Sequence, residues 1–109
     1  MEAVSEKTVM RFLDFLGVPH KYCAYQYIAS ALFITCNDTK LLNDRKCGKI
    51  LALVGNPVKK TPSTVDKGIR DLLSRIDCPL SVADFIFWAC DMLRTTPPNE
   101  WTKWNVYNC

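Results

Sequence analysis

Apolar residues along this chain recur every three or four positions, the spacing that places side chains on one face of an α-helix. A first helix is predicted from about residue 3 to Leu16, with Gly17 at its C-terminal cap. A second helix is predicted over 20–36, and it is apolar around much of its circumference, which is typical of a central helix. Strand-like alternation between hairpin turns does not occur in the sequence. The pattern therefore predicts an all-α fold.

The middle of the chain has more helix-breaking signals. Asn37–Asp38 predicts the start of a third helical segment, interrupted near Asn43–Asp44 or Gly48. Regularity then breaks at "GNP", residues 55–57, before the next helix. The candidate core positions of this region are Leu41, Leu42, Ile50, Leu51 and Val54.

A fourth helix is predicted from about Pro62 to Ile76 and a fifth over 81–94. Ser81 is the expected N-cap of the last helix, with Asp84 completing a capping box. The chain thus reads as one compact domain of about five to six helices over residues 1–94, followed by an irregular aromatic tail over 95–109. The tail carries Trp101, Trp104 and Tyr107 at intervals of three residues. Packing back on the body is the preferred expectation for these aromatics, and a partner-contact surface is the alternative.

The helix over 62–76 separates its residues into two faces. Five apolar side chains fall within one stripe of about 100° when Val65 is set at 0°. They are Val65, Ile69, Leu72, Leu73 and Ile76. The opposite side collects Ser63, Thr64, Lys67, Arg70, Asp71 and Ser74. Gly68 borders the stripe, where close approach of another helix would offset its cost of about 1 kcal/mol in helix propensity.

Two start signals overlap at the beginning of this helix. Thr61 before Pro62 fits an N-cap followed by proline at the first helical position. Ser63 with Asp66 fits a capping box instead. Backbone N–H groups at a helix N-terminus also favour phosphate.

Positive charge is concentrated in one third of the chain. Residues 40–75 hold nine basic and three acidic side chains, a net +6, whereas the rest of the chain holds five basic and eight acidic, a net −3. Such asymmetry indicates either a binding surface for a polyanion or a solvated basic face.

Other features narrow the class of protein. No run approaches the roughly 18–20 apolar residues that a membrane span needs, and "MEAVSEKTVMRFLDFLG" does not have the apolar core of a secretory signal. We therefore expect a cytoplasmic protein. Its six cysteines include no C-x-x-C pair, which favours free thiols over disulfides or zinc. Cys23, Cys36 and Cys90 are expected to be buried in apolar helical runs.

A family resemblance follows from the order of several short motifs. These are Gly17-Val18-Pro19, Tyr25-x-Tyr27-Ile28, Asn37-Asp38, Leu41-Leu42, then Thr61, Ser63, Val65 and Ile69-Arg70. Over residues 8–76 the chain resembles the C-terminal effector domain of the stage-zero sporulation response regulator (sporulation initiation factor A) of spore-forming Firmicutes. The resemblance implies an all-helical domain with a helix-turn-helix, here at about 49–76, that reads the major groove of DNA, often as dimers on tandem sites.

The chain also departs from the family pattern. Thr64 replaces a family arginine and Asp71 a family histidine. Gly55 replaces an alanine, and Pro57 falls where the first helix of the motif would continue, so we expect that helix to be shortened or shifted. The segment after Arg75 does not match the family, and we expect no receiver domain.

The resulting expectation is a stand-alone, sequence-specific transcription regulator that binds double-stranded DNA without a cofactor or metal. The expected DNA-binding residues are Lys59, Lys60, Thr61, Ser63, Thr64, Lys67, Arg70 and Ser74. The alternative is a protein-interaction module that keeps the fold but has weakened or lost DNA reading, using Trp101, Trp104 and Tyr107 or a full-length regulator as partner. An enzyme is not expected, because His20 is the only histidine and no phosphate loop or nucleophile motif occurs.

Overall fold

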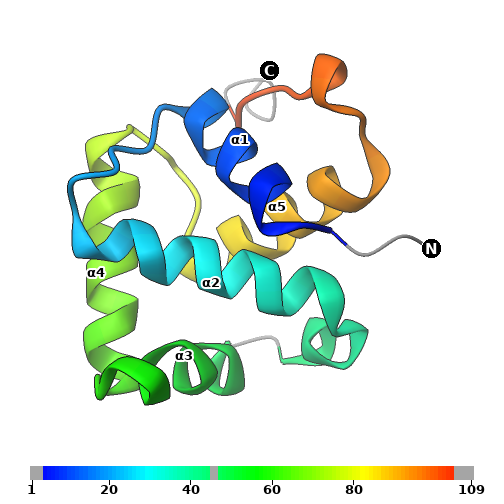
Figure 1. Cartoon of the computed structure of the whole chain (residues 1–109). Helices are drawn as coiled ribbons and strands as arrows, with labels where there is room; N and C mark the ends of the chain where they lie inside the picture. Colours follow the sequence, from blue (N-terminus) through cyan, green and yellow to red (C-terminus); the bar gives the residue numbers. More distant parts are fainter. Residues whose placement is uncertain (1–3, 45–46, 105–109) are drawn as a thin grey trace.

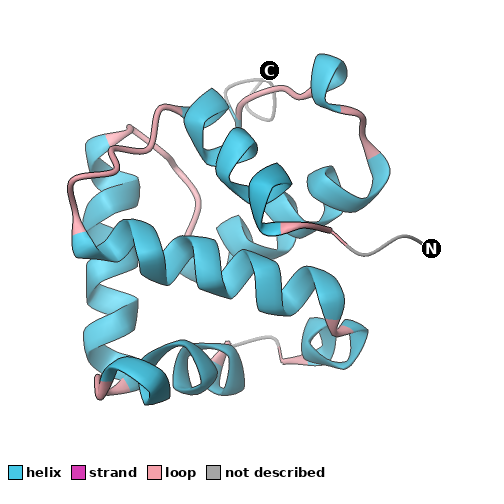
Figure 2. Ribbon diagram, viewed as in Figure 1, coloured by secondary structure: helices cyan, strands magenta, loops and turns pink. Residues whose placement is uncertain are grey.

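The computed structural model describes residues 4–44 and 47–104, and this part of the chain is helical without any strand. The predicted all-α class is therefore confirmed (Figure 2). Five α-helices are joined by loops and three short 3₁₀ turns. They are α1 (Glu6–Leu16), α2 (Cys23–Asn37), η1 (Thr39–Asn43), α3 (Gly48–Gly55), η2 (Asn56–Val58), α4 (Pro62–Arg75), α5 (Val82–Thr95) and η3 (Pro98–Glu100).

The helix α2 is the centre of the fold. It packs against α1, α3, α4 and α5, and it crosses the middle of the molecule in Figure 1. Its Tyr25, Ile28 and Leu32 are almost fully buried, and Phe33 is half-buried. The prediction of a central helix from its apolar circumference is confirmed, although α2 begins at Cys23 rather than near His20.

Capping residues define the ends of the helices largely as predicted. Ser5 caps α1, and Gly17 ends it in the left-handed region at φ 80°. Ser81 caps α5 by accepting a hydrogen bond from the Asp84 N–H at 3.1 Å. The predicted bounds of α1 and α5 are thus close to the observed ones.

The segment between α2 and α3 shows how the predicted third helix is interrupted. Asp38 caps the short turn η1 by accepting from the Lys40 N–H at 3.1 Å. The Asp44 carboxylate then accepts from the N–H groups of Lys49 and Ile50, at 2.7 and 3.2 Å. These two bonds satisfy N-terminal donors of α3, which therefore begins as a separate helix at Gly48.

The cysteines follow the prediction except at one position. Cys36 and Cys90 are buried as expected, but Cys23 is exposed because it lies in the first turn of α2, at the edge of the core. All five cysteines in the described ranges are free thiols, and Cys109 lies outside those ranges. No helix in the described part of the chain has the length and apolar character needed to cross a membrane.

Candidate nucleic-acid interface

Two helices and a short turn form the region in which DNA binding is predicted. α3 ends at Gly55 in front of η2, so the helix is shortened before Pro57, as expected. Lys59 then takes a left-handed conformation at φ 58°, and the Lys60 N–H donates to the Gly55 carbonyl at 3.0 Å. In Figure 1, α3 lies crosswise at the N-terminal end of α4, and the two helices are in contact.

The turn depends on the absence of a side chain at Gly55. A Cβ at this position would lie 2.3 Å from the Lys60 carbonyl oxygen and 3.2 Å from Cγ2 of Val65. The first contact is closer than van der Waals packing allows, and the second is tighter than usual. The chain can therefore reverse direction between α3 and α4 only if Gly55 stays small.

The buried face of α4 is the predicted apolar stripe. Val65, Ile69, Leu72 and Leu73 are almost fully buried, and Ile76 after the helix is half-buried. A Cβ on Gly68 would lie 3.3 Å from the Tyr27 ring and 3.4 Å from the Ala24 Cβ. The expected close approach of another helix at Gly68 is thus confirmed, and that helix is α2.

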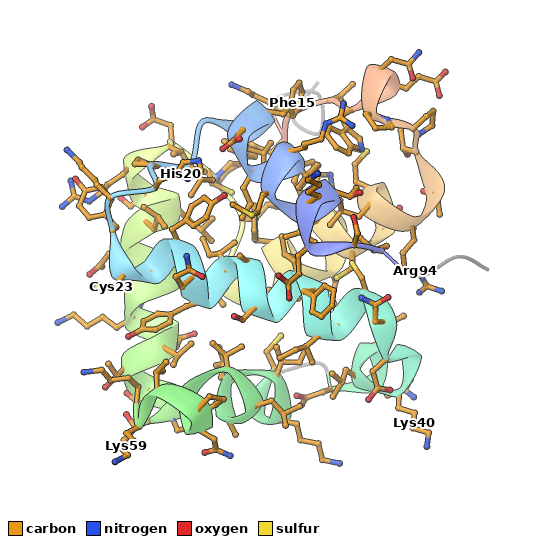
Figure 3. All side chains as sticks on the ribbon, viewed as in Figure 1. Phe15, His20, Cys23, Lys40, Lys59 and Arg94 are labelled. Atoms are coloured by element: carbon orange, nitrogen blue, oxygen red, sulfur yellow. The ribbon has the colours of Figure 1, made fainter. Side chains whose placement is uncertain are left out.

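The opposite side of α4 faces solvent. Lys59 points away from the body of the molecule near the corner where α3 and α4 meet (Figure 3). All the residues predicted to bind DNA are exposed, and they are Lys59, Lys60, Thr61, Ser63, Thr64, Lys67, Arg70 and Ser74. Three of these positions lie in the turn directly before α4 and five lie on the helix itself.

The start of α4 uses one of the two predicted signals. Thr61 is the N-cap, and its hydroxyl accepts from the Thr64 N–H at 3.1 Å, with Pro62 in the first turn. The two threonine hydroxyls also share a hydrogen bond of 2.9 Å. Ser63 lies inside the helix, so it does not cap it. Because Thr61 and Thr64 stabilise the helix start and Pro62 has no N–H, this N-terminus has fewer donors available for phosphate than the sequence implied.

Charges on the exposed face are not all of one sign. The Arg70 guanidinium pairs with the Asp66 carboxylate one turn earlier, at 3.5 Å. Asp71 is also exposed on this side. By contrast, Lys59, Lys60 and Lys67 form no ion pair within the described ranges, 4–44 and 47–104. The unpaired positive charge is therefore concentrated at the N-terminal half of α4 and the turn before it.

Further basic side chains extend this surface beyond the predicted site. Arg75, the last residue of α4, lies over the Tyr22 ring at 4.6 Å, and Lys21 lies over the same ring at 5.3 Å. Lys49 is exposed in the first turn of α3. Arg75 and Lys49 had counted toward the net charge of residues 40–75, but only the packing of α2 against α4 brings Arg75 to the ring that Lys21 also contacts.

The preferred expectation for the aromatic tail, packing back on the body, is confirmed for Trp101 and Trp104. Trp101 and Trp104 are 8% and 6% exposed. The Trp101 ring packs edge-on against Phe12 of α1 at 5.1 Å, and Trp104 against Trp88 of α5 at 6.1 Å. Tyr107 lies outside the described residues. In this structure the two tryptophans therefore belong to the core.

His20 lies in the loop between α1 and α2, with its side chain largely exposed (Figure 3). Its Nε2 atom contacts the Asp14 carboxylate, and its ring stacks on Tyr25 at 4.2 Å. These contacts connect the loop to the two helices that it joins.

No family model, curated protein or solved structure matches the chain significantly. The resemblance to the sporulation effector domain therefore rests on the sequence motifs alone.

Proposed function

We propose that this protein is a stand-alone DNA-binding transcription regulator in which α3, η2 and α4 act as a helix-turn-helix. The observation that carries the proposal is the arrangement of α4: one face is buried in the core, while the other is exposed and polar. Two lysines that form no ion pair with any described residue precede the helix. A firmly held helix with such a face has the form of helices that enter the major groove. The family resemblance of residues 8–76 supports the same proposal.

The side chains divide into two roles. Lys59 and Lys60, in the turn, approach phosphates, which position a protein on the duplex without reading sequence. Lys67 and Arg70 lie on the outward face of α4, where long basic side chains reach guanine O6 and N7. Ser63 and Ser74 supply hydroxyls to base edges or phosphates on the same side.

Asp66 affects how Arg70 takes part. Both side chains of the pair are partly exposed, so breaking it costs at most about 1 kcal/mol. A bidentate contact to guanine is worth about 1–3 kcal/mol and thus offsets that cost. In the proposed complex, Arg70 therefore leaves Asp66 and contacts DNA instead. We propose that the protein acts in the cytoplasm, and that it binds tandem sites as dimers, as in the family that the chain resembles.

The test begins with selection of bound sequences from a random DNA pool at two salt concentrations. We expect a defined motif to be enriched, with an affinity that falls steeply as salt rises because phosphate contacts release counterions. On that motif, Lys67→Ala and Arg70→Ala should each weaken binding by about tenfold, corresponding to roughly 1–2 kcal/mol per lost contact.

Lys7→Ala is the matched control. It removes one exposed positive charge from α1, away from the proposed reader, and should leave affinity within about twofold. If no motif is enriched, or if Lys67→Ala and Arg70→Ala behave like Lys7→Ala, then α4 is not a DNA reader. Binding of a protein partner with no DNA bound would then favour the interaction module.

A further inference from the structure

A second surface of opposite character lies on α5. A hollow of about 430 Å³ is lined by residues at intervals that place them on one side of this helix and the loop before it. They are Leu80, Asp84, Phe87, Trp88 and Asp91, and we call them the α5 groove. In Figure 1, α5 and α3 lie on different sides of α2, so the groove is on another part of the molecule from the turn before α4.

The floor of the α5 groove is apolar and well supported. Leu80, Phe87 and Trp88 are half-buried, with one side packed on the core. The Trp88 ring is held by Phe12 at 5.7 Å and Phe85 at 6.0 Å, in addition to Trp104. The aromatic side chains of the groove are therefore already held in place, so binding of a ligand would carry no entropic cost for ordering them.

The rim of the groove is acidic. Asp84 and Asp91 are exposed, and neither forms an ion pair within the described residues. The chain between Ile76 and Leu93 holds three aspartates and no lysine or arginine. Asp84 and Asp91 are two turns apart, about 10 Å along the helix. Half-buried aromatic rings between two unpaired carboxylates form a surface complementary to positive charge carried on an apolar scaffold.

We propose that the α5 groove binds a basic amphipathic segment of another protein. An apolar side chain of that segment fills the hollow, and two lysines or arginines about 10 Å apart pair with Asp84 and Asp91. This spacing corresponds to seven residues in a helix. The stems of the basic side chains lie across Phe87 and Trp88, where cation–π attraction adds to the ion pairs.

The charge of the groove selects among possible occupants. A nucleic acid is repelled, because its phosphates would face two carboxylates. A second copy of this chain would bring Lys59, Lys60 and the exposed Val58, which is 51% accessible. Those lysines belong to the proposed DNA site, so docking of a second copy would compete with DNA, whereas a separate protein engages the groove while DNA is bound.

The experiment uses the full chain and a designed helical peptide as probe. The peptide carries two arginines seven positions apart around a central pair of leucines, with alanine and glutamine elsewhere. A matched peptide has glutamates in place of the arginines. Binding is measured by fluorescence anisotropy, and the contact surface is mapped from amide and indole NMR shifts. We expect the basic peptide to shift the Trp88 indole resonance and to bind at least about tenfold more tightly than the acidic one.

The decisive variant is Asp84→Asn with Asp91→Asn, which removes two charges without disturbing the packed floor. It should weaken the basic peptide about fivefold or more. The control, Glu6→Gln with Glu100→Gln, removes two exposed charges elsewhere and should leave the affinity unchanged. Melting curves of both variants check that they are folded.

Three results would overturn the proposal. The first is equal affinity of the basic peptide for the decisive and control variants, and the second is NMR shifts confined to residues outside the groove. The third is concentration-dependent self-association of the protein that Asp84→Asn with Asp91→Asn abolishes, since the occupant would then be a second copy. DNA binding is measured separately, so the proposal for the α5 groove is tested independently of the proposal that α4 binds DNA.

Discussion

Individual buried polar atoms show where this fold is not optimised. Thr35 in α2 is fully buried, and its hydroxyl has no hydrogen-bond partner among the described residues. The Tyr25 hydroxyl is in the same situation. A buried polar group without a partner costs about 1–3 kcal/mol relative to a paired one. The two hydroxyls therefore lower stability rather than add to it.

Thr35→Val should raise the free energy of unfolding by about 1 kcal/mol, because valine keeps the shape and removes the unpaired hydroxyl. Urea denaturation monitored by circular dichroism measures the change. Thr95→Val is the control, because the Thr95 hydroxyl donates to the Asp91 carbonyl at 2.7 Å and its loss should not stabilise. A destabilised Thr35→Val protein would show that this hydroxyl has a partner, such as an internal water.

At the scale of elements, the turn between α3 and α4 is the most constrained part of the proposed DNA site. The helices can meet closely because Gly55 lets the Lys60 carbonyl approach. Lys59 contributes by adopting a positive φ, which is uncommon for a residue with a side chain. The position of the basic side chains before α4 is thus set by backbone geometry.

Gly55→Ala should destabilise the protein by about 2 kcal/mol or more, because the new Cβ collides with backbone rather than with a movable side chain. Gly48→Ala offers a matched comparison within the same helix. A Cβ there meets nothing within 4 Å, so that change should be neutral or slightly stabilising. Thermal unfolding of the two variants gives the comparison, and equal stability would contradict the described turn.

Across the whole molecule, the core includes groups that must remain neutral. Burial raises the pKa of the Cys47 thiol to about 11, with the carboxylate of Asp44 acting in the same direction. Burial also raises the pKa of Cys78 and of Tyr25. Because the unfolded chain loses these protons at a lower pH than the folded protein does, raising the pH through that interval favours the unfolded state.

The contribution of Cys47 to stability should therefore be constant below about pH 9 and fall between about pH 9 and about pH 11. In that interval the unfolded Cys47, with a pKa near its ordinary value of 9.0, loses its proton while the folded one keeps it. Urea denaturation under reducing conditions at several pH values measures the decline. Cys47→Ala should make it shallower, whereas Cys23→Ala, which removes an exposed thiol, should not. Identical pH profiles for the two variants would rule out Cys47 as a source.

The whole molecule also segregates charge. The basic surface before and along α4 and the acidic rim of the α5 groove lie on different parts of the same core. Residues 96–104 complete that core, since Trp101 and Trp104 cover Phe12 and Trp88. The two surfaces are thus presented by one packed body.

Local patterns in the sequence were enough to predict the helices, most of their caps and the two faces of α4. These features depend on residues within one or two turns of each other: an N-cap hydroxyl and an N–H three residues later, or apolar positions at intervals of three and four. For the same reason the buried stripe of α4 and its exposed basic face were readable from spacing alone.

Contacts between distant parts of the chain were not readable in this way. Cys23 is exposed because α2 begins at the edge of the core, and Arg75 lies over the Tyr22 ring only because α2 packs on α4. The burial of Trp101 depends on α1, far away in sequence, and the α5 groove exists because the aromatic floor is held from several helices. Such contacts depend on how faces meet in space, which the periodicity of a single helix does not specify.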